Sequence, residues 1–596
     1  MTESIGPSRK PLTWPRLTVS SIACTVLLAL TGLLGCESRP ETRKELSATF
    51  LLGKDALDSP VSTAAFAPGE GSPPSHAFEG RLSLQILSGQ SRIEPVLDLF
   101  DTLANASLEV SRMPPFSFEF IQDGSDLIPL QRGLQASQHP YWEYILEPGK
   151  VWEEPGDRGY ARASIPFSVQ QRNANCTHNG LLTFLFKSDG SVSRSAYQIT
   201  SETCRYLQVD LWGALPAVYE PGTIPDKEAV IEAYREEVAA RLPVRPLEAL
   251  ARDYPGVDPG RLMMHDPDQV STYGFVINKV HYSGGCQTRY GPYPFCSVLD
   301  LPSYSLAKSV FAATALMWLE QHYPGAGELL VMDYVAECDD EKRWAGVTLE
   351  QLVDMSTGNY LSTKDHEDEF YSYETDFIAS ETHQGKIKAS CSLYPRQTEP
   401  GSKFVYHSSD IYIAGVLMNA FLREQTHRDG SGMADIYRDV MVPELMKPLN
   451  LSPVTWKTKR TYDQARQPFT GFGLTFHSDD IVRFAMFLQN NGGAIGGEQV
   501  LSRKVLDAAL QRDPSDTGLD TNGESFRYNN GFWAYDAWQA ASCENESWIP
   551  YMSGYGGISI VLIPNNSIYY VFSDGGHFQW AQAVSESIKI KRICKY

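Results

Sequence analysis

The chain has 596 residues, of which 42% are hydrophobic and 21% charged, so it is globular and long enough for two or three domains. Its formal net charge of −21 at pH 7 argues against nucleic acid or an anionic lipid surface as the main partner. The sequence contains no run of basic residues that would overturn this exclusion.

The first 36 residues have the pattern of an export signal. Three basic residues precede the apolar stretch LTVSSIACTVLLALTGLLGC, and its end, LLGC, resembles the bacterial lipoprotein cleavage box, in which the cysteine becomes the lipidated first residue. An uncleaved signal anchor is the alternative, because about 18 apolar residues nearly span a bilayer. We expect a signal peptide over residues 1–36, lipidation at Cys36, and a body held outside the cytoplasm on a bacterial cell-envelope membrane.

Two segments of different composition follow. Residues 37–75 are rich in Ser, Pro, Gly and Glu, which predicts a flexible tether. Residues 76–222 show short alternating segments such as RLSLQIL and RYLQVDLW, separated by turn residues, which predicts a β-rich N-terminal domain of the sandwich type. No nucleophile and base share a suitable spacing there, so this domain is interpreted as a spacer or interaction module.

The remaining residues, 223–596, are assigned to a second domain. An amphipathic helix is predicted near 225–242 and a strand near 273–282. Helices and loops continue to about 470, and ISIVLIP and SIYYVFS near the C-terminus are typical of adjacent antiparallel strands.

Of the ten cysteines, two lie in the signal region, and the even remainder in an exported chain indicates disulfides. A metal site is the disfavoured alternative, since no CxxC, HxxxH or HExxH spacing occurs, and no cofactor is expected. Eight cysteines allow 105 connectivities, and because each successive pair flanks a local loop we expect sequential pairing. The eight are Cys176, Cys204, Cys286, Cys296, Cys338, Cys391, Cys543 and Cys594.

The stretch LPSYSLAKSVFAATALMWLEQ (301–321) raises a question of chemistry. Ser305 stands three residues before Lys308 where a helix should begin, and this spacing places both side chains on one helix face, with Cβ atoms about 5–6 Å apart. A helix N-terminus also offers free N–H groups to a developing anion. The pair is either a Ser cap with a solvated Lys or a nucleophile with its base. As a base, Lys308 would have to be neutral, which requires burial and a partner.

That partner is sought in FVYHSSDIYIAGVLM, where Tyr406 and Ser408 form a Y-x-S spacing before an apolar helix. Together with YSLAKSV, this segment resembles the serine β-lactamase and penicillin-binding-protein-like hydrolases. The similarity is greatest to the class C β-lactamase-related branch, with its esterases, D-amino-acid peptidases and 6-aminohexanoate-oligomer hydrolases. It extends over residues 225–596 in the expected order. It implies an α+β fold, with an antiparallel sheet flanked by helices plus an all-α subdomain, here preceded by the β-rich domain.

The third motif of that family departs from its pattern here. Relatives have Lys-Thr-Gly or His-x-Gly, whereas YMSGYGG (551–557) aligns Met552-Ser553-Gly554 and lacks the cation. This favours a neutral ester or amide over a β-lactam or D-Ala-D-Ala substrate. The resemblance implies an oxyanion hole from the N–H groups of Ser305 and Tyr555, with Gly554 and Gly556 allowing close approach of substrate and Gly556 as the alternative donor. A tight β-bulge without chemistry is the other interpretation of these glycines.

The expected function is a lipid-anchored serine hydrolase acting on a small ester or amide. Ser305 would attack, Lys308 and Tyr406 would exchange its proton, and Ser408 would hydrogen-bond near Lys308. A penicillin-interactive D,D-carboxypeptidase or β-lactamase and a non-catalytic envelope-binding protein are the alternatives.

Two other features receive plainer interpretations. The acidic run DHEDEF (365–370) is interpreted as a solvated loop rather than a metal site, and His407 is expected to point away from the catalytic face. A Ser-His-Asp scheme is discounted because no G-x-S-x-G segment occurs.

Overall fold

The computed structural model describes residues 44–69, 71–87, 89–263, 266–364, 366–370, 372–426, 434–521, 523 and 525–594. The expected signal peptide and lipidation site Cys36 lie outside these residues. Thr42–Tyr596 form one compact unit. Within the described ranges, each helix is too short or too polar to cross a lipid bilayer.

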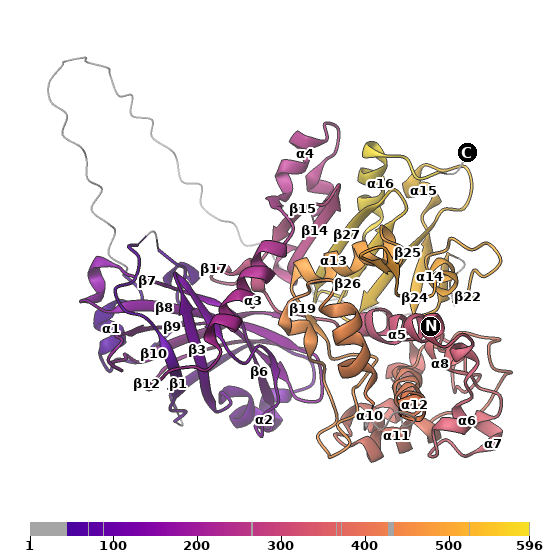
Figure 1. The fold of residues 1–596 in the computed structure, drawn as a ribbon, viewed down its shortest axis with the longest axis horizontal. Coiled ribbons are helices and arrows are strands. Elements are labelled where there is room, and N and C mark those ends of the chain that lie inside the picture. Colours follow the sequence, from indigo (N-terminus) through magenta and orange to yellow (C-terminus); the bar gives the residue numbers. More distant parts are fainter. Residues whose placement is uncertain are drawn as a thin grey trace, which may run out of the picture. The chain divides into compact units, whose positions relative to one another are not determined.

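A twelve-stranded sheet, antiparallel throughout, makes up most of the region expected to be β-rich (Figure 1). The main strand order is β12-β1-β3-β4-β7-β8-β9-β10-β11-β2, and β6 joins β5 to β8. The strands are β1 (Glu79–Leu84), β2 (Ser91–Asp98), β3 (Phe116–Asp123), β4 (Asp126–Pro129), β5 (Gly133–Gln135), β6 (Trp142–Leu146), β7 (Gly149–Trp152), β8 (Ala161–Gln171), β9 (Thr177–Phe186), β10 (Ser195–Thr203), β11 (Leu207–Leu215) and β12 (Ala217–Pro221).

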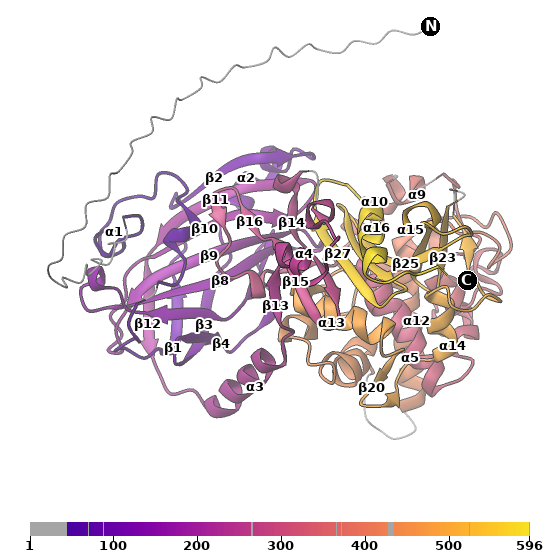
Figure 2. The same ribbon diagram turned by 90° about the horizontal axis from the view of Figure 1, so that it is seen from above.

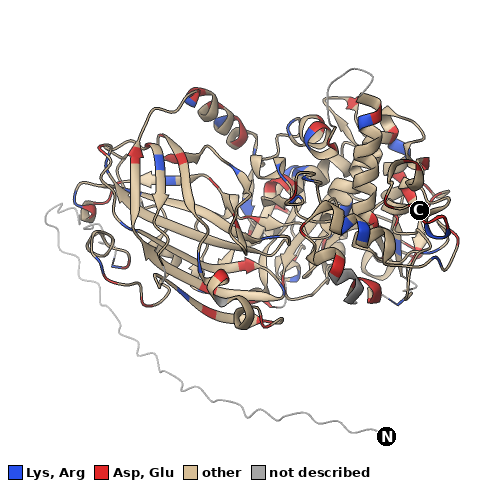
Figure 3. Ribbon diagram, turned by 90° about the horizontal axis from the view of Figure 1, so that it is seen from below, with Lys and Arg blue, Asp and Glu red and all other residues tan. Residues whose placement is uncertain are grey.

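The central strands β8 to β11 are buried on both faces. In β9 the side chains alternate, so that Leu182 and Phe184 enter the core of this sheet while Leu181 and Leu185 enter the core of the rest of the chain. Figure 3 shows that these strands carry few charged residues, as burial on both faces requires. The sheet is therefore not a detached spacer, because one of its faces belongs to the main hydrophobic core.

The segment expected to be a flexible tether is packed where it is described. Ser47 caps α1 (Ala48–Leu52), and Leu51 and Phe66 are fully buried in the main core. The Gln198 side chain makes two hydrogen bonds to the backbone of Val61, which fixes the segment against β10. Its Ser- and Pro-rich composition suggested flexibility, but scattered apolar residues anchor it, so the prediction is wrong for residues 44–66.

A second sheet has nine strands in the order β13-β15-β14-β27-β26-β25-β24-β23-β22, and every pair is antiparallel except β13 with β15. The expected strand near 273–282 is a hairpin, because Asn278 and Lys279 both take positive φ and reverse the chain. The strands are β13 (Val244–Pro246), β14 (Val270–Ile277), β15 (Val280–Gly285), β22 (Leu519–Asp520), β23 (Phe526–Asn529), β24 (Phe532–Asp536), β25 (Trp548–Gly554), β26 (Ile558–Ile563) and β27 (Ser567–Ser573).

Helices cover both faces of this second sheet, which confirms the expected α+β class. Side chains of α16 share one core with one face, whereas α5, α12 and α13 share the main core with the other (Figure 2). The helices beyond α1 are α2 (Thr102–Ser111), α3 (Lys227–Ala240), α4 (Leu250–Asp253), α5 (Thr314–His322), α6 (Val331–Tyr334), α7 (Glu341–Trp344), α8 (Leu349–Val353), α9 (Glu367–Phe370), α10 (Ser372–Ala379), α11 (His383–Ser392), α12 (Ser408–Thr426), α13 (Ser478–Gln489), α14 (Arg503–Ala509), α15 (Trp538–Ala541) and α16 (Ala581–Ile590), with π-helices η7 (Lys308–Ala313) and η9 (Ile436–Met446).

Helix α3 forms where its periodicity predicts, but its apolar stripe is not buried. Polar contacts hold it to the twelve-stranded sheet instead: Arg235 forms a bidentate pair with Asp123 at 2.8 Å, and Lys227 pairs with Glu79 at 2.9 Å. The expected domain boundary near residue 222 lies just before this helix.

The four disulfides join the eight cysteines in the sequential pattern that the sequence predicts. The pairs are Cys176–Cys204, Cys286–Cys296, Cys338–Cys391 and Cys543–Cys594. Such bonds fit an exported protein.

A buried ionic cluster joins the twelve-stranded sheet to the rest of the chain. Glu147 accepts from Arg132 at 2.8 Å and lies 3.5 Å from His477 Nε2, which lies 3.8 Å from Asp300. Burial opposes the charge on His477, but the surrounding carboxylates prevail and raise its pKa to about 9. Burial and the Glu147 charge raise the pKa of Asp300. Glu147, Asp300 and His477 lie close enough together to ligate a metal. A protonated His477 and the ion pair between Glu147 and Arg132 instead favour a cluster that holds a proton.

We expect the free energy of unfolding to fall as pH rises from 6.5 to 9. His477 holds its proton to about pH 9 when folded but to about 6.5 when unfolded, so its contribution is complete below 6.5 and is lost on passing 9. The loss is on the order of 2–3 kcal/mol. Urea unfolding at pH 6.5, 7.5 and 9 measures it, and His477→Gln should flatten the slope.

His281→Gln is the matched control. His281 is also buried, but burial lowers its pKa to about 4, so it carries no proton in this range and its replacement should keep the wild-type slope. Equal slopes in the wild type and His477→Gln would contradict the prediction.

Candidate active site

A strained turn places Ser305 at the start of a helix. Tyr304 has a φ of +43°, a left-handed conformation that costs roughly 1–2 kcal/mol for a residue with a side chain. The Ser303 N–H before it donates to the Leu474 carbonyl at 2.9 Å, and the Lys308 N–H after it donates to the Ser305 carbonyl at 2.9 Å. Ser305 is half-buried, so its hydroxyl is held firmly and remains accessible.

One side chain of the twelve-stranded sheet holds this turn. Asn175 lies in the loop between β8 and β9, and its Oδ1 accepts from the Ser303 hydroxyl at 3.0 Å, the Tyr304 N–H at 2.7 Å and the Gly473 N–H at 3.0 Å. Its Nδ2 donates to the Leu474 carbonyl at 3.3 Å. Asn175 is 1% exposed, so these bonds form away from water, where unmet partners are costly. The backbone of the candidate nucleophile is thus positioned by the domain that the sequence suggested to be a spacer or interaction module.

A disulfide fastens the loop that carries Asn175. Cys176 is bonded to Cys204, which begins the connection from β10 to β11. The next residue, Arg205, donates to the Asp574 carbonyl at 3.4 Å, and its guanidinium packs against Gly576. The twelve-stranded sheet therefore also brings a cation to the strand segment that follows the third motif.

Lys308 lies between the two serines that the sequence singled out. Its Nζ is 3.1 Å from Ser305 Oγ and 2.8 Å from Ser408 Oγ, and it lies 4.6 Å from the centre of the Tyr406 ring. Lys308 is 2% exposed. The four residues meet although about 100 positions separate the two pairs, as the motif order predicts.

Tyr406 is almost completely buried, at 8% exposure, and its ring packs near Trp533. Burial raises the pKa of its phenol, while the Lys308 charge and hydrogen bonding with Lys308 and Ser305 oppose that effect. A phenol with a raised pKa keeps its proton in neutral solution and can donate it to a leaving group.

Within the acidic run, the described residues 366–370 are not the solvated loop that its composition suggested. Glu369 accepts from the Ser408 N–H at 2.8 Å and from the Ser408 hydroxyl, so a carboxylate lies two hydrogen bonds from Lys308, through Ser408. Asp368 is 1% exposed and lies 3.0 Å from His407 Nε2. A run of acidic residues is expected to be solvated only when no buried donor lies opposite it. Here Ser408 faces Glu369 and His407 faces Asp368.

His407 is buried in contacts separate from the nucleophile. Besides Asp368, it lies 3.4 Å from Asp410 through Nδ1, and its ring stacks on Tyr394 with centres 4.0 Å apart. These contacts anchor the start of α12. Ser408 is therefore held by the packing of its neighbour His407 and by its own bonds to Glu369.

The third motif lies at the end of β25, against the nucleophile turn. A Cβ on Gly554 would come 2.6 Å from the Ser303 carbonyl oxygen, so a side chain does not fit there. Gly556 and Gly557, with φ of +96° and +106°, form the turn from β25 to β26 rather than a bulge within a strand. Ser553 donates to the Ile558 carbonyl at 3.4 Å.

Two backbone N–H groups at this junction are open. Within the part of the chain that the structure describes, neither the Ser305 N–H nor the Tyr555 N–H donates a hydrogen bond. The Tyr555 and Tyr304 rings are 5.8 Å apart, which keeps the two segments adjacent. These are the donors that an oxyanion would use.

Aromatic side chains surround the catalytic candidates. The His366 ring lies 4.5 Å from the Tyr406 ring and 6.1 Å from that of Trp533, and Phe370 lies 6.3 Å from Tyr555. Phe370 is 68% exposed, which is unusual for so large an apolar side chain and offers a surface to a ligand.

The predicted residues Ser305, Tyr406 and Ser408 thus each contact Lys308, and Gly554 lies against the Ser305 turn. Sequence reasoning missed Asn175 and Glu369. Neither has a local signal, because each acts through residues far away in the chain.

No protein-family model and no curated protein matches the chain. Among solved structures, it is similar to a Bacillus anthracis protein assigned as a 6-aminohexanoate-dimer hydrolase, with 16% identity over 59% of this chain and 86% of that one and a TM-score of 0.41. It is also similar to a tyrosine-to-phenylalanine mutant of a class C β-lactamase, with 11% identity over 62% of this chain and 98% of that one and a TM-score of 0.37. Both are distant, so the chemistry below is derived from the residues of this chain.

Replacing Asn175 by Ala should lower kcat by about 10²-fold, because a misplaced nucleophile is sufficient for such a loss. The variant also leaves three donors unmet, so its melting temperature should fall. Steady-state kinetics on a chromogenic ester, measured well below the melting temperature, separates the two effects.

Asn179→Ala is the matched control. Asn179 is also buried and bonds across to the Asp300 backbone at 3.0 Å through both its amide atoms, but it does not touch the nucleophile turn. Its loss should destabilise the protein and leave kcat unchanged. Equal kcat losses in both variants would contradict a positioning role for Asn175.

Proposed function

We propose that the protein is an exported serine hydrolase that cleaves a small ester or amide through an acyl-enzyme on Ser305. The observation that carries this proposal is the buried Lys308 amine within hydrogen-bonding distance of both Ser305 and Ser408, beneath the Tyr406 ring. A serine hydroxyl is a weak nucleophile until a base takes its proton, and this arrangement supplies one.

Acylation begins when Ser305 Oγ attacks the substrate carbonyl carbon. The Ser305 proton passes to the Lys308 amine, because the raised pKa of Tyr406 leaves its phenol already protonated. Charge develops on the carbonyl oxygen, and the open N–H groups of Ser305 and Tyr555 stabilise it. Tyr406 then donates a proton to the leaving alcohol or amine, and the bond from the carbonyl carbon to that group breaks.

Glu369 extends the proton path. Lys308 contacts Ser408, whose hydroxyl donates to Glu369, so a proton taken from Ser305 has a continuous route to a carboxylate. Deacylation uses the same groups in reverse: water attacks the acyl carbon, its proton enters the Lys308–Tyr406 pair, and Ser305 leaves with its proton restored.

The walls of the site favour an apolar acyl or leaving group. Phe370, Tyr555 and Trp533 offer aromatic surface, and the third motif has Ser553 where a cation would hold a substrate carboxylate. The four disulfides support export, and we further propose attachment to the cell-envelope membrane through a lipid on Cys36.

A fluorophosphonate probe should label the wild type, and Ser305→Ala should abolish both labelling and ester hydrolysis. Lys308→Ala and Tyr406→Phe should each lower kcat by about 10²–10⁴-fold, the usual range for a lost acid or base. A panel of p-nitrophenyl esters and anilides of increasing acyl length identifies the substrate class.

Ser309→Ala is the matched control, because Ser309 lies on the same helix but donates to the Gly531 carbonyl at 2.6 Å. It should keep wild-type labelling. If the wild type neither labels nor hydrolyses any substrate of the panel, the non-catalytic binding protein becomes the better account.

The penicillin-interactive alternative gains one observation, because Arg205 places a cation against Gly576, whose N–H donates to the Gly556 carbonyl at 2.8 Å. We nevertheless expect fluorescent penicillin to label poorly under conditions in which the fluorophosphonate labels completely, since the Arg205 guanidinium is engaged by the Asp574 carbonyl. Stoichiometric penicillin labelling that disappears in Arg205→Ala would overturn the assignment to neutral substrates.

A further inference from the structure

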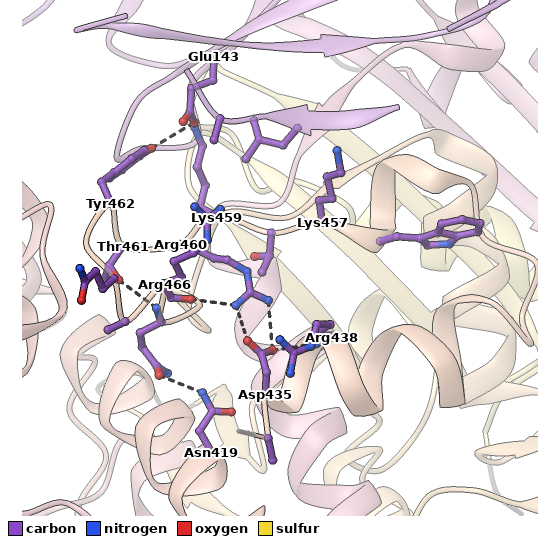
Figure 4. Close-up of a pocket in the computed structure, with 18 of the residues that line it drawn as sticks. Glu143, Asn419, Asp435, Arg438, Lys457, Lys459, Arg460, Thr461, Tyr462 and Arg466 are labelled. Atoms are coloured by element: carbon purple, nitrogen blue, oxygen red, sulfur yellow. Dashed lines mark hydrogen bonds and ion pairs between the residues drawn. The ribbon is translucent and has the colours of Figure 1, made fainter. Parts of the chain in front are cut away.

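A second cavity lies away from Ser305, between the twelve-stranded sheet and the end of α12. It has a volume of about 480 Å³, which is within the range of small-molecule sites. The segment 456–467 forms much of its wall, and Glu143 and Asn419 add to it (Figure 4). Arg423 of α12 also lines the cavity. Ser408 and Arg423 lie 15 residues apart on α12, or about 22 Å along its axis, so this cavity is distinct from the catalytic site.

The lining is basic in a protein whose net charge is −21. Glu143 and Asp435 are its acidic members, and its cations outnumber them threefold. The cations are Arg423, Arg438, Lys457, Lys459, Arg460 and Arg466.

Half of these cations are neutralised by the protein itself. Lys459 pairs with Glu143, Arg460 with Asp435, and Arg438 with Asp439 at 2.6 Å. The pairs of Lys459 and Arg460 use both carboxylates that line the cavity, Glu143 and Asp435.

The other three cations have no such neighbour. Among the described residues, no hydrogen bond or ion pair involves the charged groups of Arg423, Lys457 or Arg466. Partial burial lowers the pKa of Arg423, and no carboxylate opposes that effect. Unpaired cations grouped around one cavity repel one another, and an anion placed between them would remove that cost.

Buried donors in the same wall also lack partners. Thr458 Oγ1 and Gln467 Nε2 make no hydrogen bond within the described ranges, although these residues are only 5% and 7% exposed. Both atoms are closed off from the cavity by their neighbours, so they do not reach a ligand in it, and recognition depends on the three cations.

We propose that this cavity binds a small phosphorylated molecule through Arg423, Lys457 and Arg466. Guanidinium groups match phosphate oxygens in pairs, and an ammonium adds a point charge. The ligand is either a free sugar phosphate or the headgroup of an anionic lipid, which share this chemistry.

The experiment uses the whole soluble body of the protein and calorimetric titration with glucose 6-phosphate, inorganic phosphate and, as the neutral control, glucose. Binding of glucose 6-phosphate but not glucose is expected, and it should weaken as salt rises. The double variant Arg423→Gln/Lys457→Gln should bind at least tenfold more weakly.

Arg503→Gln/Lys342→Gln removes the same charge from exposed sites elsewhere and should bind like the wild type. Ester hydrolysis should be unchanged in both variants, so this test is independent of the proposed catalysis. If the double variant fails to fold, the exposed Lys457→Gln alone serves, with a loss of at least threefold expected.

Co-sedimentation with phosphatidylglycerol and phosphatidylcholine vesicles decides the source. Selective, Lys457-dependent sedimentation with phosphatidylglycerol, without glucose 6-phosphate binding, assigns the site to a lipid headgroup. Absence of binding to phosphate, glucose 6-phosphate and vesicles, or equal binding by wild type and double variant, would overturn the proposal.

Discussion

The amide of Asn175 holds together segments that lie 128 and 298 residues further along the chain. The turn before Ser305 includes a left-handed Tyr304, a conformation that persists only where the surroundings over-determine it. Asn175 supplies that determination with three accepted hydrogen bonds and one donated bond. The geometry of the candidate site therefore depends on the twelve-stranded sheet as much as on the helix that bears Ser305.

Other buried polar contacts run in parallel with this one. Lys459 pairs with Glu143, Ser168 donates to Asp300 at 2.8 Å, and the His477 cluster adds paired charges. Removing one member of a buried pair leaves an uncompensated charge and typically costs 3–5 kcal/mol. These contacts fix the position of the twelve-stranded sheet against the rest of the chain, because a shifted sheet would leave each polar group without its partner. The apolar side chains of β9 that enter the main core supply the non-directional part of the same association.

How far the sequence could predict this arrangement depended on whether a residue acts locally. Ser305 and Lys308 were found because the helical period alone puts them on one face, and the strands at the C-terminus alternate plainly. Asn175 and Glu369 were not found, since their partners come from elsewhere and nothing in their neighbours marks them. The composition suggested a flexible tether at residues 44–66 and a solvated loop at residues 366–370. Tertiary packing overrode both expectations. The basic cavity was invisible for the same reason, because its cations are assembled from α12, η9 and the segment 456–467.

The disulfide between Cys176 and Cys204 joins the loop that carries Asn175 to the connection between β10 and β11, so the support of the Ser305 turn depends on the redox state of two thiols. A newly made chain in a reducing cytoplasm lacks this closure, and its nucleophile turn lacks a fixed support. Under the proposed function, formation of this disulfide in an oxidising compartment would precede hydrolase activity, and a chain kept in a reducing compartment would stay inactive.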